Sequence, residues 1–147
     1  MTCRIAQVTL DVVDVERMSE FWSLALGYRV VPDEGRSVHL VPPDDADFDR
    51  PTMWLQPVDD GKHRKNRCHP DLDADDPAAE VTRLLELGAT HADVGQRGDE
   101  GFVVLSDPEG NEFCVLGTDR RVSTSGERTG VCDCTVGGTG SPEVTHV

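Results

Sequence analysis

The chain has 147 residues, of which 37% are hydrophobic and 29% are charged, and its formal net charge is -14. This composition indicates one soluble globular domain with an apolar core, and it excludes a membrane-spanning helix because no run of about 18 apolar residues occurs. The negative charge argues against nucleic acid as a partner, since binding phosphates needs a basic face.

The N-terminus lacks a charged segment followed by an apolar one, so we expect no signal peptide and a cytoplasmic location. Five cysteines occur, and their odd number and irregular spacing argue against a disulfide framework. Cys132 and Cys134 could hold a soft metal, but a structural zinc site needs four ligands and no second pair of cysteines is present.

The first part of the chain predicts a strand, a helix and three further strands. Residues 4–13 alternate between apolar and polar side chains, which is typical of a half-buried strand. Asp14 can cap the following helix, whose apolar residues recur at helical spacing until Gly27. Three further strands are expected at residues 28–31, 37–41 and 52–58.

The same order of elements recurs in the second part of the chain. A strand over residues 67–75 precedes a helix that Asp76 caps, with Pro77 in its first position and Gly88 at its end. Three further strands are expected at residues 89–94, 102–106 and 111–116. Repetition at this period predicts an α+β fold of two βαβββ modules with mixed sheets, which share a core and enclose a cleft.

We place the first module at residues 1–61, the second at residues 62–117, and a Gly/Ser/Thr-rich tail at residues 118–147. A basic cluster over residues 62–67 falls between the modules. We interpret this cluster first as a solvated linker, because charge runs are usually solvated, and second as a clamp for an anion.

Side-chain direction follows from alternation along each strand. In each module the helix covers one face of the sheet, so the apolar residues of every strand point toward the helix and their neighbours point into the cleft. The cleft-facing set is polar, and either water or a ligand can satisfy it. The residues concerned are Gln7, Thr9, Asp11, Trp54, Gln56, His69, Asp71, Asp73, Glu112 and Cys114, with His39 as a further candidate.

Three segments carry a resemblance to a known superfamily. They are Asn66-Arg-Cys-His69, Leu87-Gly-Ala89 and Asp107-Pro-Glu-Gly-Asn-Glu-Phe-Cys-Val-Leu116. Together with the double βαβββ repeat, they make residues 4–117 resemble the vicinal oxygen chelate (VOC) superfamily, in its glyoxalase-like and bleomycin-resistance-like branch. The closing segment is the most specific of the three.

The resemblance implies a ligand set for a divalent metal such as Zn, Ni, Mn or Fe. Metal-dependent members carry ligands on the first and fourth strands of each module, typically His or Gln, Glu, His and Glu. By position these ligands would be Gln7, Gln56, His69 and Cys114. Both acids are missing, which removes the negative oxygens that hold a hard or borderline ion, unless Glu112 substitutes.

Each candidate residue has more than one interpretation. His69 is a metal ligand, a group that binds a ligand or moves a proton, or a structural histidine. Cys114 is a small semi-buried apolar residue or a nucleophile. Gln7 and Gln56 suit hydrogen bonding to a polar ligand as well as metal ligation, and Trp54 is either a stacking wall or part of the core.

These observations leave three functional hypotheses. The first is a VOC protein that binds a small molecule in the cleft of its two modules without the usual metal set. The second is a metal-dependent lyase, isomerase or dioxygenase, with His69 and Glu112 as the candidate catalytic residues. The third is a protein-interaction module. The ligand-binding candidates are Gln7, Thr9, Trp54, Gln56, His69, Asp71, Glu112 and Cys114, and a homodimer is compatible with the superfamily.

Overall fold

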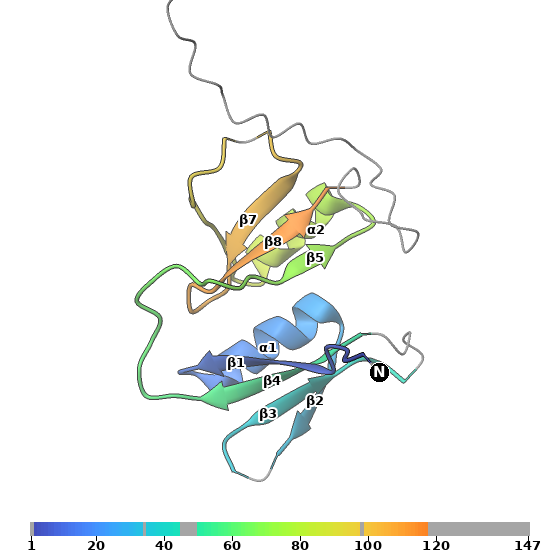
Figure 1. The fold of residues 1–147 in the computed structure, drawn as a ribbon, viewed down its shortest axis with the longest axis vertical. Helices are drawn as coiled ribbons and strands as arrows, with labels where there is room; N and C mark the ends of the chain where they lie inside the picture. Colours follow the sequence, from blue (N-terminus) through green and yellow to red (C-terminus); the bar gives the residue numbers. More distant parts are fainter. Residues whose placement is uncertain (1, 34, 45–49, 98, 118–147) are drawn as a thin grey trace, which may run out of the picture.

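A computed structural model describes residues 2–33, 35–44, 50–97 and 99–117. The first module consists of β1 (Gln7–Val12), α1 (Val15–Leu26), β2 (Arg29–Pro32), β3 (Val38–Val41) and β4 (Thr52–Pro57). The second consists of β5 (Asp71–Asp73), α2 (Pro77–Glu86), β6 (Thr90–His91), β7 (Phe102–Ser106) and β8 (Glu112–Leu116). The expected α+β architecture of two βαβββ modules is confirmed (Figure 1).

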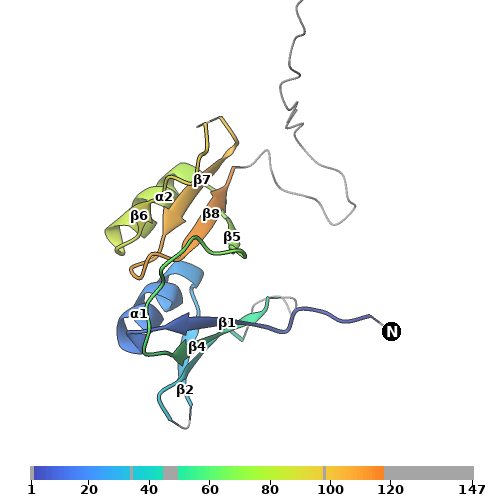
Figure 2. The same ribbon diagram turned by 60° about the vertical axis from the view of Figure 1, so that its left-hand side comes forward.

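Both sheets have the same topology. Their strand orders are β1-β4-β3-β2 and β5-β8-β7-β6. In each sheet the first and last strands of the module are parallel, and the remaining pairs are antiparallel. Figure 2 shows both helices on the same side of the molecule, so the opposite faces of the two sheets remain uncovered by helices.

The predicted helix caps are present. The Asp14 side chain accepts a hydrogen bond of 3.0 Å from the Arg17 backbone N–H, and Gly27 ends α1 in the left-handed region at φ 65°. In α2 the Asp76 side chain accepts a 3.1 Å hydrogen bond from the Ala79 N–H. Local sequence chemistry therefore determines where both helices begin.

The two modules share one core, as predicted. Trp22 and Phe21 of α1 pack against Phe113 of β8, with ring centroids 5.3 and 6.1 Å apart respectively. The Trp22 indole N–H donates a 3.2 Å hydrogen bond to the buried Asp107 carboxylate in the β7–β8 turn. Burial raises the pKa of Asp107. Hydrogen bonds from Asn111, Trp22 and Glu109 lower it by less, so the pKa stays above its ordinary value.

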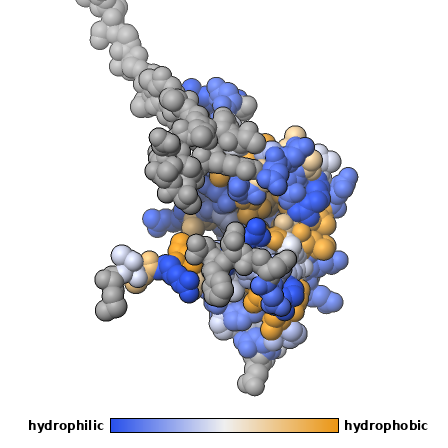
Figure 3. Space-filling model, turned by 90° about the vertical axis from the view of Figure 1, so that its right-hand side faces the viewer, coloured by the Kyte–Doolittle hydropathy of each residue, from blue (hydrophilic) through white to orange (hydrophobic). Residues whose placement is uncertain are grey.

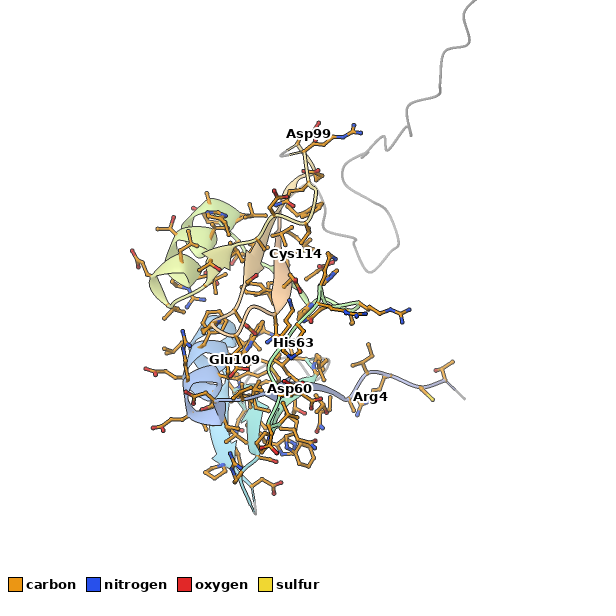
Figure 4. The ribbon with its side chains drawn as sticks, turned by 90° about the vertical axis from the view of Figure 1, so that its left-hand side faces the viewer. Arg4, Asp60, His63, Asp99, Glu109 and Cys114 are labelled. Carbon is orange, nitrogen blue, oxygen red and sulfur yellow. The ribbon has the colours of Figure 1, made fainter. Side chains whose placement is uncertain are left out.

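The second module also contacts both ends of α1. The Glu109 carboxylate, beside α1 in Figure 4, accepts hydrogen bonds from the Val13 and Asp14 backbone N–H groups. At the other end, the Arg83 guanidinium donates 3.0 Å hydrogen bonds to the Leu24 and Ala25 carbonyl oxygens. A negative group at the helix N-terminus and a positive group at its C-terminus both complement the helix dipole.

The structure shortens three predicted strands, of which β1 covers Gln7–Val12 of the predicted residues 4–13. β5 covers only residues 71–73, so His69 lies in the segment before the strand and the prediction of a strand over residues 67–75 is wrong. Pro70 has no backbone N–H to donate to a neighbouring strand. The His69 side chain folds back on the preceding residues, where its Nε2 atom lies 2.8 Å from the Asn66 carbonyl oxygen. β6 is likewise reduced to Thr90–His91. The predicted tail, with Cys132 and Cys134, lies outside the described residues.

Hydrophilic residues dominate the face seen in Figure 3, with hydrophobic patches between them. Exposed apolar residues such as Ile5 and Leu24 are ordinary features of a protein surface. Among the described residues, no helix is long and apolar enough to cross a membrane.

Candidate functional site

A pocket of about 320 Å³ lies on the face of the second sheet that points away from α2. Phe113 and Val115 of β8 are buried on the helix side, so Glu112 and Cys114 point to the opposite face, as alternation predicted. Figure 4 labels Cys114 among the strands of this module. The pocket is lined by Lys65, His69, Asp71, Val94, Phe102, Val104, Glu112, Cys114 and Leu116.

Glu112 is held by the segment that joins the two modules. One carboxylate oxygen accepts a 2.8 Å hydrogen bond from Lys62 Nζ, and the other accepts a 2.9 Å hydrogen bond from the Asn66 backbone N–H. Burial raises the pKa of Glu112, but the bonds from Lys62 and Asn66 outweigh burial and leave the pKa below its ordinary value. This arrangement favours an anchoring role for Glu112 over proton transfer, because a general base needs a pKa near the working pH.

His69 is surrounded by polar groups of the same segment. Its Nε2 atom lies 2.8 Å from Lys65 Nζ and 2.8 Å from the Asn66 carbonyl oxygen. Lys65 is therefore part of the site, although the sequence placed it in a solvated linker. The only signal that pointed to it was the alternative interpretation of the basic cluster as an anion clamp.

The candidates of the first module form a separate group on the open face of the first sheet. Gln7 Oε1 lies 3.0 Å from His39 Nε2, and the His39 ring packs against Trp54 at a centroid distance of 4.4 Å. His39 thus shares this face, as suggested by the sequence. Thr9 and Gln56 are exposed on the neighbouring strands β1 and β4. The Trp54 indole nitrogen is buried and has no hydrogen-bond partner among the described residues.

The structure therefore divides the sequence candidates into two groups. His69, Asp71, Glu112 and Cys114 line the pocket of the second module, whereas Gln7, Thr9, Trp54 and Gln56 do not line it. A larger hollow of about 1010 Å³ lies between the modules, and Asp71 is the one residue of the eight that lines it. The apolar walls at Phe102 and Val104 were not named from the sequence, although alternation along β7 places them on the same face.

The four positions implied by the superfamily do not form a donor set for a divalent metal within the described part of the chain. The four positions implied by the superfamily fall into the two groups above, and the Gln7 carbonyl oxygen is already 3.0 Å from His39. The positive Lys65 ammonium lies 2.8 Å from His69 Nε2, which opposes a second cation at that nitrogen. Among the described residues, no three His, Cys, Asp or Glu side chains are grouped closely enough to hold a metal.

Comparison with known proteins agrees with this fold. The model of the glyoxalase-like domain family matches residues 7–116. The chain belongs to this family. A search of curated proteins found no significant match.

Solved structures of the glyoxalase/bleomycin resistance/dioxygenase superfamily share the fold of this glyoxalase-like protein. The fosfomycin resistance protein FosX from Mesorhizobium loti is 20% identical with a TM-score of 0.61, covering 80% of this chain and 95% of its own. A variant of FosX from Listeria monocytogenes, solved with Mn(II) and dihydroxypropylphosphonic acid, is 15% identical with a TM-score of 0.63. The match covers 80% of this chain and 93% of that FosX chain. A superfamily enzyme from Burkholderia phytofirmans PsJN is 17% identical with a TM-score of 0.58, and the match covers 77% of this chain and 97% of that enzyme.

Proposed function

We propose that this glyoxalase-like protein of the VOC superfamily binds a small molecule in the pocket of its second module. The observation that carries the proposal is the composition of that pocket, which combines apolar walls with a few polar groups gathered around His69. Binding sites for small molecules have this character, and the volume of about 320 Å³ lies at the small end of their usual range of about 300–1,000 Å³.

Filling the pocket should abolish binding. We expect titration with a library of small organic fragments to shift the NMR signals of pocket residues, and Cys114→Phe to remove these shifts because the ring occupies the space beside β8. Cys68→Phe is the matched control, since Cys68 is exposed and does not line the pocket. Shifts that persist in Cys114→Phe, or that lie outside the pocket, would contradict the proposal.

The alternative of a metal-dependent lyase, isomerase or dioxygenase makes a different prediction. It requires stoichiometric metal uptake that His69→Ala abolishes and His63→Ala does not. His63 belongs to the same segment, but its ring faces Asp60 at 2.9 Å (Figure 4). Because Lys65 already places a positive charge beside His69, we expect equally low nickel, zinc, manganese and iron content in the wild type and both variants, measured by elemental analysis. Stoichiometric, His69-dependent metal would favour the enzyme.

The third hypothesis, an interaction module without a small ligand, predicts an open face filled by side chains. The pocket of about 320 Å³ on that face supports the small-molecule proposal instead.

A further inference from the structure

The pocket contains one lysine that forms no ion pair with a carboxylate of the described residues. Lys62 and Glu112 form a largely buried ion pair, so their charges cancel. Lys65, three residues further along, lines the pocket and makes no ion pair within the described part of the chain; its ammonium contacts His69 Nε2 at 2.8 Å. A lysine ammonium has three donors and no acceptor, so it can bind an incoming anion while keeping other contacts.

The contacts of His69 allow the Lys65 ammonium to turn toward a bound anion without leaving the His69 ring unpaired. His69 Nε2 lies 2.8 Å from both Lys65 Nζ and the Asn66 carbonyl oxygen. When the neutral His69 ring carries its hydrogen on Nδ1, Nε2 accepts a hydrogen bond from the Lys65 ammonium. When the hydrogen is on Nε2, that atom donates to the Asn66 carbonyl oxygen. Each of the two tautomers therefore satisfies only one of the two contacts. An anion that draws Lys65 away allows His69 to donate to Asn66, and the Nε2 atom keeps a hydrogen bond.

The other charges of the site limit how negative the anion can be. Asp71 lines the same pocket and carries the opposite charge to Lys65. A head group with one negative charge matches a single ammonium, whereas a second charge would add repulsion from Asp71. The net charge of -14 acts mainly at long range, and charges more than about 8 Å away are largely screened at physiological salt.

The remaining walls are apolar and suit an uncharged body. They are formed by Val94, Phe102, Val104 and Leu116. We propose that the pocket takes a small molecule with one carboxylate-type anion on an apolar body, with Lys65 as the counter-ion of that anion. This inference rests on the proposed small-molecule function and names its ligand class.

Four probes with the same aromatic body test the charge preference on the full chain. They are phenylacetate, neutral phenylacetamide, cationic phenethylamine and doubly charged phenylmalonate, each titrated by NMR at pH 7. We expect phenylacetate to bind most tightly, with shifts at the pocket residues. Lys65→Gln should weaken phenylacetate about fivefold and leave phenylacetamide unchanged. Arg64→Gln is the matched control, because Arg64 is an exposed cation of the same cluster that does not line the pocket.

The outcomes separate this inference from the function on which it rests. Equal binding of phenylacetate and phenylacetamide in the pocket would overturn the charge preference and leave small-molecule binding standing. Tighter binding of phenylmalonate or phenethylamine would overturn the assignment of a single negative charge. An equal effect of Lys65→Gln and Arg64→Gln would overturn the role of Lys65. Pocket shifts with none of the four probes would overturn the proposed function and this inference with it.

Discussion

Replacing Phe113 by alanine should lower the free energy of unfolding by about 3–5 kcal/mol. Phe113 is fully buried, and its ring contacts both Phe21 and Trp22 of α1. The variant therefore loses buried apolar area and leaves a cavity at the junction of the two modules, where the surrounding rings can relax only partly. Urea unfolding followed by circular dichroism measures the loss.

Phe102→Ala is the matched control for this prediction. Phe102 lies on the neighbouring strand β7 of the same sheet, but it is half-buried and lines the pocket on the opposite face. Removing its ring enlarges an open pocket instead of creating a closed cavity, so the loss should be clearly smaller. Equal losses for the two variants would show that the junction between the modules does not carry the stability assigned to it.

Replacing Lys62 by methionine should cost about 1–3 kcal/mol at pH 7, because the buried Glu112 carboxylate loses its charged partner. The two side chains are 18% and 9% exposed, so water replaces the lost interaction only in part. Arg64→Met is the control, and replacing this exposed residue of the same cluster should change stability by less than about 0.5 kcal/mol. Thermal or urea unfolding at fixed pH measures both.

The effect of Lys62→Met should shrink in acid. The folded-state pKa of Glu112 lies below its ordinary value of 4.5, so its ionised form contributes stability above pH 4.5 that is lost as the pH falls through the folded-state pKa. Once Glu112 is protonated in both proteins, Lys62 has no charge to neutralise. Unfolding curves at pH 7 and at progressively lower pH should therefore converge, and a constant difference would argue against the ion pair.

Much of the fold was predictable because it depends on neighbours in the chain. Alternation correctly placed Met53 and Leu55 on the buried face of β4, and Asp14 and Asp76 cap the helices at the predicted positions. The strand before α2 was predicted too long, since Pro70 and the hydrogen bonds of His69 end the extended pairing early. The His69 side chain contacts the Lys65 ammonium and the Asn66 carbonyl oxygen, and a hydropathy pattern does not record such contacts.

The amino-acid sequence alone determined the order of elements, the buried faces of β4 and β8, and the glycine and aspartate residues that bound the helices, because each depends on residues within a few positions. The tertiary structure alone decided which polar residues share a pocket. Lys62 reaches Glu112 across 50 positions of sequence, and this contact brings Lys65 and His69 to the open face of the second sheet. Such contacts depend on how the two modules and their connecting segment pack, and no local pattern encodes that packing.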